Sequence, residues 1–371
     1  MTLRLTPIAL LVALLHVYIG ARLLPGLDLA GQLAGGALLV GCFWLLPKGW
    51  HARDDARPWK VLVPWIATGF FSWLLVLTLL RELTLLAALV ALDAATRAQW
   101  ARISALGILV ATPLITIAGF VMARKVARVV EVDVPLSGLP RELHGFTIAQ
   151  ISDIHVGPTI KRAFVERIVA RVNLLEADMV AITGDLVDGS VRELAHHTEP
   201  LGNLASRHGT YVVTGNHEYY SGANAWITEL RRLGARVLMN EHVLLDHDGA
   251  ALAVAGVTDY SAHHFDPSHR SDAPAAMQGV PRDAVKVLLA HQPRSAAGAS
   301  AVGFDLQLSG HTHGGQFWPW NLFVRLQQPF TAGLNRLGKM WIYISRGTGY
   351  WGPPMRFGIP SEITRIRLVP G

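Results

Sequence analysis

The sequence predicts a protein of two parts, an all-α membrane domain over residues 1–125 and an α/β domain over residues 126–371. Three observations support this division. Four apolar stretches precede residue 125, short strand-like runs alternate with amphipathic helices after residue 128, and polar side chains follow five of those runs. A chain of 371 residues is long enough for two or three domains.

The composition is apolar and basic. Hydrophobic residues make up 51% of the chain and charged residues only 16%, whereas a soluble domain carries about 25% charged residues. The formal charge of +6 favours a phosphate-bearing or anionic-lipid partner. No basic run interleaved with aromatic residues occurs, so no nucleic-acid partner is expected. The single cysteine, Cys42, excludes an intramolecular disulfide.

The four apolar stretches predict about four transmembrane helices. They cover residues 8–24, 29–46, 61–80 and 103–122, and each approaches the roughly 20 residues that cross a bilayer. A secretory signal peptide would explain only the first stretch. A fifth apolar run, residues 83–92, is too short to span, and either extends the third helix past Arg81 and Glu82 or forms a short interfacial helix.

The lysines and arginines near the ends of these stretches predict the orientation. With four spans, one side of the membrane holds eight of them and the other side holds four. Since cytoplasmic loops carry the excess of basic residues, we expect a multi-pass protein of the cell membrane with both termini and the α/β domain in the cytoplasm. This expectation depends on an even number of spans.

Residues 126–371 show the pattern of an α/β domain. Residues 162–175 and 225–233 read as helices between strand-like runs, which implies a largely parallel sheet buried on both faces. The expected strands are residues 129–134, 147–151, 179–182, 211–213, 252–255, 285–289, 306–308 and 341–345.

Five of the expected strands run directly into polar residues. In such folds the functional residues lie just beyond the carboxyl ends of strands. The sequence therefore predicts that one edge of the domain gathers all of these side chains. They are Asp153 and His155, Asp185 and Asp188, Asn216 and His217, His291, and His311 and His313.

The spacing of two pairs suits metal binding. Asp153 and His155 are two residues apart, as are His311 and His313, so on an extended backbone the two members of each pair point to the same side. Each pair could then grip one ion from two directions.

Three further side chains complete a ligand set. Asp185 follows a glycine and could bridge two metal ions, Asn216 offers an amide oxygen, and His291 offers another nitrogen. Mixed oxygen and nitrogen donors suit Mn²⁺, Fe or Zn²⁺ better than an all-oxygen Mg²⁺ or Ca²⁺ site or a thiolate zinc site. Two ions about 3.5–4 Å apart could activate a water for attack on a phosphate ester.

The order of these motifs resembles that of the calcineurin-like metallophosphoesterases. It runs Asp-x-His, Gly-Asp-x-x-Asp, Gly-Asn-His-Glu, His, Gly-His-x-His, and the resemblance covers about residues 145–368. The segments Gly-Asn-His-Glu-Tyr-Tyr, Gly-His-Thr-His-Gly-Gly-Gln and Ser-Arg-Gly are similar to bacterial membrane-associated members. The resemblance implies a four-layer αββα sandwich with two mixed sheets, and it links the chain more weakly to cleavage of phospholipid or lipid-precursor diesters.

The resemblance also implies a role for each residue. Two divalent transition-metal ions, Mn, Fe or Zn, would be held, with Asp185 as the shared ligand. His217 would lie near the leaving-group oxygen, and Asp188 would orient it. The remaining ligands would be Asp153, His155 and His313 for one ion and Asn216, His291 and His311 for the other.

Two weaker features stay open at this point. Arg346 follows a strand and could bind a substrate phosphate, although a surface arginine is the expectation. The aromatic segment from Phe317 to Phe330 could belong to the core or could receive an acyl chain.

The sequence therefore favours a metal-dependent hydrolase of phosphodiester or pyrophosphate bonds, with a lipid-linked substrate as one version. Two alternatives are a tethered phosphatase acting on soluble nucleotides or phosphoproteins, and a membrane sensor that binds metal without turnover. An intact His217 and Asp188 argue against the sensor, because a protein without turnover needs no proton donor.

Overall fold

The computed structural model describes residues 7–50 and 58–371 and divides the chain into two compact units. The helical unit contains α1 to α4 and Gly352–Met355, and the second unit contains residues 125–351 and 356–371. Three of the charges used to predict the orientation, Arg4, Arg53 and Arg57, lie outside the described residues.

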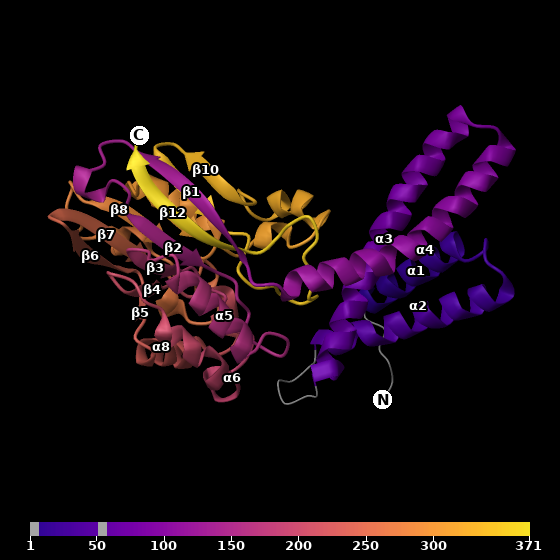
Figure 1. The fold of residues 1–371 in the computed structure, drawn as a ribbon, viewed down its shortest axis with the longest axis horizontal. Helices are drawn as coiled ribbons and strands as arrows, with labels where there is room; N and C mark the ends of the chain where they lie inside the picture. Colours follow the sequence, from indigo (N-terminus) through magenta and orange to yellow (C-terminus); the bar gives the residue numbers. More distant parts are fainter. Residues whose placement is uncertain (1–6, 51–57) are drawn as a thin grey trace. The chain divides into compact units, whose positions relative to one another are not determined.

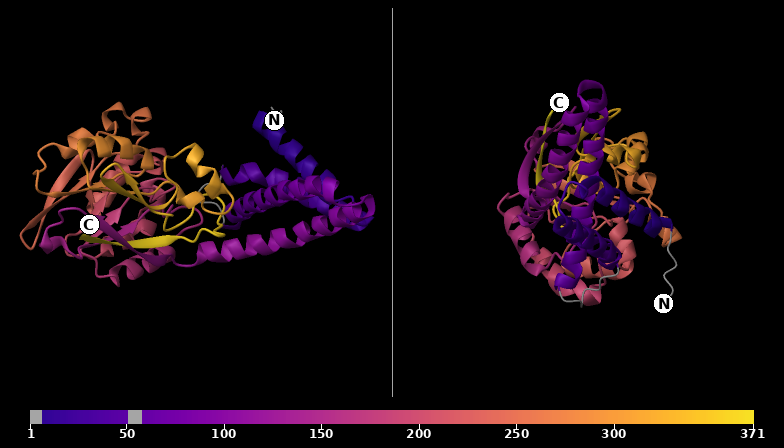
Figure 2. Two further views of the ribbon diagram at one scale, coloured as in Figure 1. Left: turned by 90° about the horizontal axis from the view of Figure 1, so that it is seen from above. Right: turned by 90° about the vertical axis from the view of Figure 1, so that its right-hand side faces the viewer.

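The helical unit consists of four apolar helices, of which α3 and α4 run side by side (Figure 1 and Figure 2). Three of them are long and apolar enough to cross a membrane, over Leu29–Gly49, Trp59–Ala91 and Ala94–Arg124. The helix bounds are α1 (Pro7–Leu23), α2 (Leu29–Trp50), α3 (Pro58–Ala91) and α4 (Ala94–Arg124).

The predicted number of four transmembrane helices is slightly too high for the described residues. Helix α1 has 17 residues, which at 1.5 Å per residue cover about 26 Å of the roughly 30 Å of hydrocarbon. Pro25 follows its carboxyl end and cannot continue the helix. This shortening changes the parity on which the predicted orientation depends.

The apolar run at residues 83–92 extends α3 to Ala91 and does not form a separate interfacial helix, which confirms the first of the two expectations for this run. The helix continues because the charges in its middle are satisfied within the helical unit. Arg81 is buried, and its guanidinium donates to Glu82 Oε1 (2.9 Å) and to the Ala101 carbonyl (2.7 Å). Arg22 of α1 also pairs with Glu82. Mutual pairing of this kind is the usual way in which charges are accommodated among apolar helices.

The second unit contains two six-stranded mixed sheets, which confirms the sandwich implied by the family resemblance. The first sheet has the order β1 (Arg128–Leu136), β12 (Glu362–Pro370), β2 (Thr147–Ile151), β3 (Met179–Ile182), β4 (Thr210–Val212) and β5 (Arg236–Val237). The second has the order β10 (Gly333–Leu337), β11 (Met340–Ile344), β9 (Leu306–Ser309), β8 (Val285–Leu289), β7 (Ala250–Gly256) and β6 (Glu241–His247).

The single, largely parallel sheet expected from the strand-helix alternation is therefore wrong in two respects. The parallel strands β2 to β5 belong to one sheet, and the parallel strands β7, β8, β9 and β11 belong to the other. Antiparallel pairs occur at β12–β2, β6–β7 and β10–β11. Four strands, β5, β6, β10 and β12, were not predicted. Strand β12 alternates buried Ile366 and Leu368 with the charged Arg365 and Arg367, which weakens its apolar signal, yet it pairs between β1 and β2.

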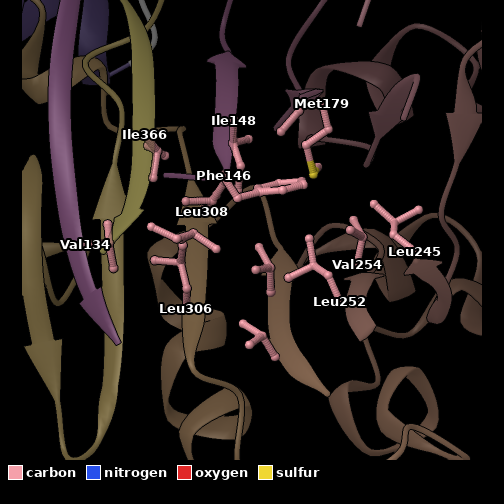
Figure 3. Packing of buried hydrophobic residues seen from close by; sticks show 14 of the residues in the cluster. Val134, Phe146, Ile148, Met179, Leu245, Leu252, Val254, Leu306, Leu308 and Ile366 are labelled. Carbon is pink, nitrogen blue, oxygen red and sulfur yellow. The ribbon is translucent and has the colours of Figure 1, made fainter. Parts of the chain in front are cut away.

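The two sheets pack face to face through alternate residues of their strands. Ile148 and Met179 of the first sheet join Val254 and Leu308 of the second in one buried cluster (Figure 3). The intervening residues face the outer layers, because successive side chains of a strand point to opposite faces. Leu288 of β8, for example, packs with Ala299 of α10 in a separate cluster.

Helices cover the outer faces. Helix α5 buries Phe164, Val165, Ile168, Val169 and Val172, the spacing of an amphipathic helix on a core. It lies beside the first sheet with α6 and α8 (Figure 1). The helices are α5 (Arg162–Asn173), α6 (Val191–Thr198), α7 (Asn216–Tyr220), α8 (Ala223–Arg232), α9 (Ala273–Met277) and α10 (Ala296–Val302).

Short 3₁₀ helices occupy several of the connections. They are η1 (Arg141–Leu143), η2 (Glu199–Asn203), η3 (Ala262–His264), η4 (Pro267–His269), η5 (Pro293–Ser295), η6 (His313–Gly315), η7 (Trp320–Leu322) and η8 (Val324–Leu326).

Candidate metal centre

Five loops converge where the carboxyl ends of the two sheets meet. Strands β2, β3 and β4 of the first sheet and β8 and β9 of the second each lead into one of the predicted motifs. The structure brings the ligand atoms together in three overlapping groups, within each of which they lie no more than 4.8 Å apart. The groups are Asp153, His155 and His313; His155, Asp185 and His217; and Asp185, His291 and His311.

The backbone of these loops is not extended. Asp153, His155, Asp185, His311 and His313 have φ angles of 54°, 56°, 53°, 71° and 50°. This left-handed conformation is uncommon for residues other than glycine and costs of the order of 1–3 kcal/mol each, and it is found where function requires it. The extended backbone expected at residues 153–155 and 311–313 is therefore wrong. Asp153 and His155 nevertheless share one group, whereas His311 and His313 belong to different groups, so the expectation that this second pair holds a single ion is wrong.

Backbone hydrogen bonds between loops hold this conformation. The Asp153 amide donates to the Gly184 carbonyl (3.0 Å), and the His155 amide donates to the Asp185 carbonyl (3.2 Å). A Cβ atom on Gly215 would lie 2.1 Å from Asp185 Oδ1. Glycine at position 215 is therefore required for the close approach of the β3 and β4 loops.

In the first group, two imidazole nitrogens face each other. His155 Nε2 lies 3.0 Å from His313 Nε2, and Asp153 Oδ1 lies 3.6 Å from the same His313 nitrogen. His155 Nδ1 donates to Asp188 Oδ1 (3.0 Å), so the lone pair of a neutral His155 ring lies on Nε2 and points into the group.

The third group is built around Asp185. Its Oδ2 lies 3.1 Å from His291 Nε2, and that nitrogen lies 3.2 Å from His311 Nδ1. The other ring nitrogen of His291 donates to the Thr183 carbonyl (2.7 Å), which fixes the orientation of the ring.

Asn216 supplies the observation that tests whether a cation fits. Its Oδ1 atom is buried and accepts no hydrogen bond, which is costly for an amide oxygen. A cation bound next to Asp185 and His291 would satisfy this oxygen. The donor set thus fits a metal centre built from carboxylate, amide and imidazole groups.

Electrostatics keep two of the imidazoles neutral. Burial, with the nearby His291 adding to it, lowers the pKa of His311 to about 3, and burial with the nearby His155 lowers the pKa of His313. Neutral imidazoles are the form that binds metal ions. Burial alone would raise the pKa of Asp185, but the charges of His291 and His217 outweigh it and lower that pKa, so the carboxylate stays ionised.

His217 and Asp188 form a pair beside these groups. His217 Nδ1 donates to Asp188 Oδ1 over 2.6 Å, and its Nε2 lies 3.9 Å from Asp185 Oδ2. Burial lowers the pKa of His217, but the carboxylates of Asp185 and Asp188 raise it to about 9 overall. Burial likewise opposes ionisation of Asp188, yet His155 and His217 bring its pKa to about 2. The two carboxylates thus favour the protonated form of the His217 ring.

Two further residues support the loops. The buried carboxylate of Glu218 accepts hydrogen bonds from the amides of Gly215 (2.7 Å), Asp185 (3.0 Å) and Leu186 (2.7 Å). Arg356 was missed, because an isolated arginine carries no motif that distinguishes it from a surface residue. It is fully buried and donates to the His313 carbonyl and to His313 Nδ1, both over 3.1 Å.

Arg346 is not a freely solvated arginine. Its Nη1 donates to Glu362 Oε2 over 2.7 Å, and Glu362 is fully buried while the Arg346 side chain is 30% exposed. Contact of Arg346 with a substrate phosphate stays a prediction.

This fold with this set of donors is that of metal-dependent phosphoesterases. A family model described as calcineurin-like phosphoesterase matches residues 146–315. A metallophosphoesterase of Aquifex aeolicus is 34% identical over 60% of this chain and 84% of its own length. The chain belongs to the calcineurin-like phosphoesterase family.

Two other relatives are longer than the region they share with this chain. A transmembrane protein with metallophosphoesterase domain from Danio rerio is 38% identical over 70% of this chain, and a metallophosphoesterase of Helicobacter pylori is 40% identical over 66%. The chain spans 61% and 64% of the length of these two relatives.

The central position of Asp185 gives a first prediction. Asp185→Asn should lose most of the bound metal, because Asp185 lies in two of the three ligand groups and its charge holds neighbouring nitrogens in place. Elemental analysis of purified protein measures the metal content per chain. The exposed Asp283→Asn is the matched control. A metal content that Asp185→Asn leaves at the wild-type value would contradict this ligand assignment.

Proposed function

We propose that the chain is a membrane-anchored phosphoesterase that hydrolyses a phosphodiester or pyrophosphate bond with two divalent metal ions. The observation that carries this proposal is the position of His217, whose Nδ1 donates to Asp188 over 2.6 Å and whose Nε2 lies 3.9 Å from Asp185, beside the candidate metal ligands. A metal site with a purely structural role needs no proton donor at its edge.

The ligand groups suggest how two ions would be held. Asp185 would be shared between them, and Mn²⁺, Fe or Zn²⁺ would suit the mixed donors. When bound, such ions lower the pKa of a coordinated water, bind phosphate oxygens and neutralise charge during in-line displacement. One ion would take Asp153, His155 and His313, and the other Asn216, His291 and His311.

The side chains outside the ligand set then have their own tasks. His217 would donate its Nε2 proton to the departing alkoxide, which avoids the release of a strongly basic leaving group. Asp188 accepts from Nδ1 of the same ring and so stabilises the imidazolium, whose second proton lies on Nε2 and is the one transferred. The aromatic rings of Tyr220 and Trp351 lie 5.1 and 5.7 Å from the His217 ring, centre to centre, and restrict its motion.

Replacing the proposed acid separates proton transfer from metal binding. His217→Ala should keep the bound metal while kcat falls by about 10²–10⁴-fold, the usual contribution of a positioned acid. The loss should be smallest for nitrophenyl esters, whose leaving groups need little protonation. Steady-state rates across a series of leaving groups and elemental analysis measure both effects, with the exposed His144→Ala as control. Equal losses across the series, or loss of metal, would rule out the acid role.

A lipid-linked substrate is the finer version of this proposal. Part of the aromatic segment belongs to the core, because Phe317 is buried and Phe330 packs on a core cluster. The side chains of Leu322, Phe323 and Leu326, by contrast, are 63%, 52% and 82% exposed. Exposed apolar groups of this kind mark contact with apolar partners. The backbone of η7, which carries Leu322, lies directly against Gly315 of the loop that holds His313.

The exposed side chains give a test of substrate class. If they contact an acyl chain, burial of four methylenes contributes about 3 kcal/mol, roughly a hundredfold in affinity. The double variant Phe323→Ala/Leu326→Ala should then reduce the ratio of kcat/KM between a phospholipid diester and a water-soluble nitrophenyl diester by at least about tenfold. The exposed Leu174→Ala serves as control. A wild-type enzyme that cleaves both diesters equally well would favour a tethered phosphatase acting on soluble nucleotides or phosphoproteins.

We propose a cytoplasmic placement of the second unit with three spans as well as with four. With α2, α3 and α4 as the spans, seven lysines and arginines lie on the side of the second unit and five on the other. The bias still favours the cytoplasm, although the segment before α2 moves to the opposite side. The seven are Lys48, Arg53, Arg57, Lys60, Arg124, Lys125 and Arg128, and the five are Arg4, Arg22, Arg81, Arg97 and Arg102.

Cysteine labelling tests this orientation. On a Cys42→Ser background, Asp283→Cys in the second unit should react with a membrane-impermeant maleimide only after the cells are opened. Leu92→Cys, between α3 and α4, should react in intact cells. Labelling in the reverse order would show that the second unit lies outside.

A further inference from the structure

A cavity of about 600 Å³ lies at the carboxyl ends of β7 and β8, outside the groups assigned to metal binding. It is lined by loop residues after β7, by η3 and by the segment that begins with η5. Its polar lining consists mainly of Tyr260, His263, His264, Arg270, Asp272 and Arg294.

The cavity is positively charged. Two arginines line it against one carboxylate, Asp272, which already accepts from the Ala275 amide (2.9 Å) at the start of α9. Arg294 Nε donates to the Gln327 carbonyl (2.8 Å), a neutral acceptor that leaves its charge uncompensated. Within residues 7–50 and 58–371, neither Arg270 nor Arg294 forms an ion pair with a carboxylate.

The histidines add donors without adding fixed charge. The rings of His263 and His264 lie 4.0 Å apart, and the Nδ1 atom of His263 is buried with no hydrogen-bond partner among the described residues. An unsatisfied buried nitrogen is unusual.

The lining of the cavity is connected to the metal centre by two short chain segments. Arg294 lies three residues after His291, and the intervening Gln292 donates to Asp259 (3.1 Å), which precedes Tyr260. On the other side, Arg270 follows His269, whose ring contacts the Tyr219 hydroxyl over 3.0 Å.

Tyr219 belongs to α7, the helix that begins with Asn216 and His217. A ligand held in the cavity would therefore lie next to the candidate centre on the side of Asn216 and His291.

We propose that this cavity is a second anion-binding subsite, which takes a phosphate or carboxylate group carried by the substrate away from the bond that is cleaved. The proposal rests on the proposed phosphoesterase function and narrows it to substrates with at least two anionic groups. An arginine fork binds such a group through two parallel hydrogen bonds, and Arg270 offers one. Arg294, whose Nε and Nη2 both donate to the Gln327 carbonyl, adds a second positive charge.

The test compares two synthetic diesters that differ only in a distal anion, ethyl p-nitrophenyl phosphate and 2-(phosphonooxy)ethyl p-nitrophenyl phosphate. The detergent-solubilised full chain with Mn²⁺ should prefer the second by about ten- to hundredfold in kcat/KM, the value of one charge-assisted hydrogen bond. Arg270→Ala and Arg294→Ala should bring this ratio towards one, and Arg270→Lys should restore part of it. Arg171→Ala, an exposed arginine on α5, should keep the wild-type ratio.

A second arm does not depend on turnover. Calorimetry on the Asp185→Asn protein with 2-(phosphonooxy)ethyl methyl phosphate should give a dissociation constant that Arg270→Ala raises by about tenfold or more. Equal kcat/KM for the two diesters in the wild type, or binding that Arg270→Ala leaves unaltered, would overturn the subsite. Failure of the wild type to cleave either diester would overturn the proposed function. The calorimetric measurement would still show whether the cavity binds the anion.

Discussion

The carboxylate of Glu218 is the interaction on which the candidate centre most depends. It accepts from the backbone amides of Gly215, Asp185 and Leu186, and so joins the loop after β3 to the loop after β4. Burial and the nearby Asp185 raise the pKa of Glu218 to about 7, which shows how unfavourable a second carboxylate is at this place. The three amides offset this cost by donating to it. Without this carboxylate, three buried amides would lack an acceptor, and the loops carrying Asp185 and Asn216 would lose their common support.

The same balance between burial and charge extends across the centre. His291 and His217 keep Asp185 ionised, while His311 and His313 stay neutral because they are buried next to other basic groups. Arg356 places a positive charge next to the His313 ring. Burial lowers the pKa of Arg356 to about 10, and the nearby charge of Asp153 opposes this only in part. A centre with this many desolvated groups is stable only if the ionised members are paired, which explains why ligand groups and supporting groups lie in direct contact.

The fold supplies the geometry that this balance requires. Two separate sheets end at the same place, so ligands distant in the sequence, such as Asp153 and His311, meet through the bond from the His311 amide to Asp153 Oδ1 (2.9 Å). The left-handed conformation of five ligand residues is held by bonds between loops rather than by local preference. The cationic cavity beside the centre arises in the same way, from the connections that follow β7 and β8.

The sequence by itself determined the membrane-capable helices, most of the central strands and the strand ends at which the polar residues stand. These features depend on local patterns, namely apolar runs and the abrupt change from apolar to polar residues at a strand end. Only the tertiary structure decided the insertion of β12 between β1 and β2, because Arg365 and Arg367 mask its apolar face. Only the tertiary structure also shows the left-handed backbone conformation of the candidate ligands, the burial of Arg356 and the placement of two arginines in the cavity. Each of these follows from contacts between segments far apart in the chain, and the identity of a residue carries no information about such contacts until the two sheets have packed.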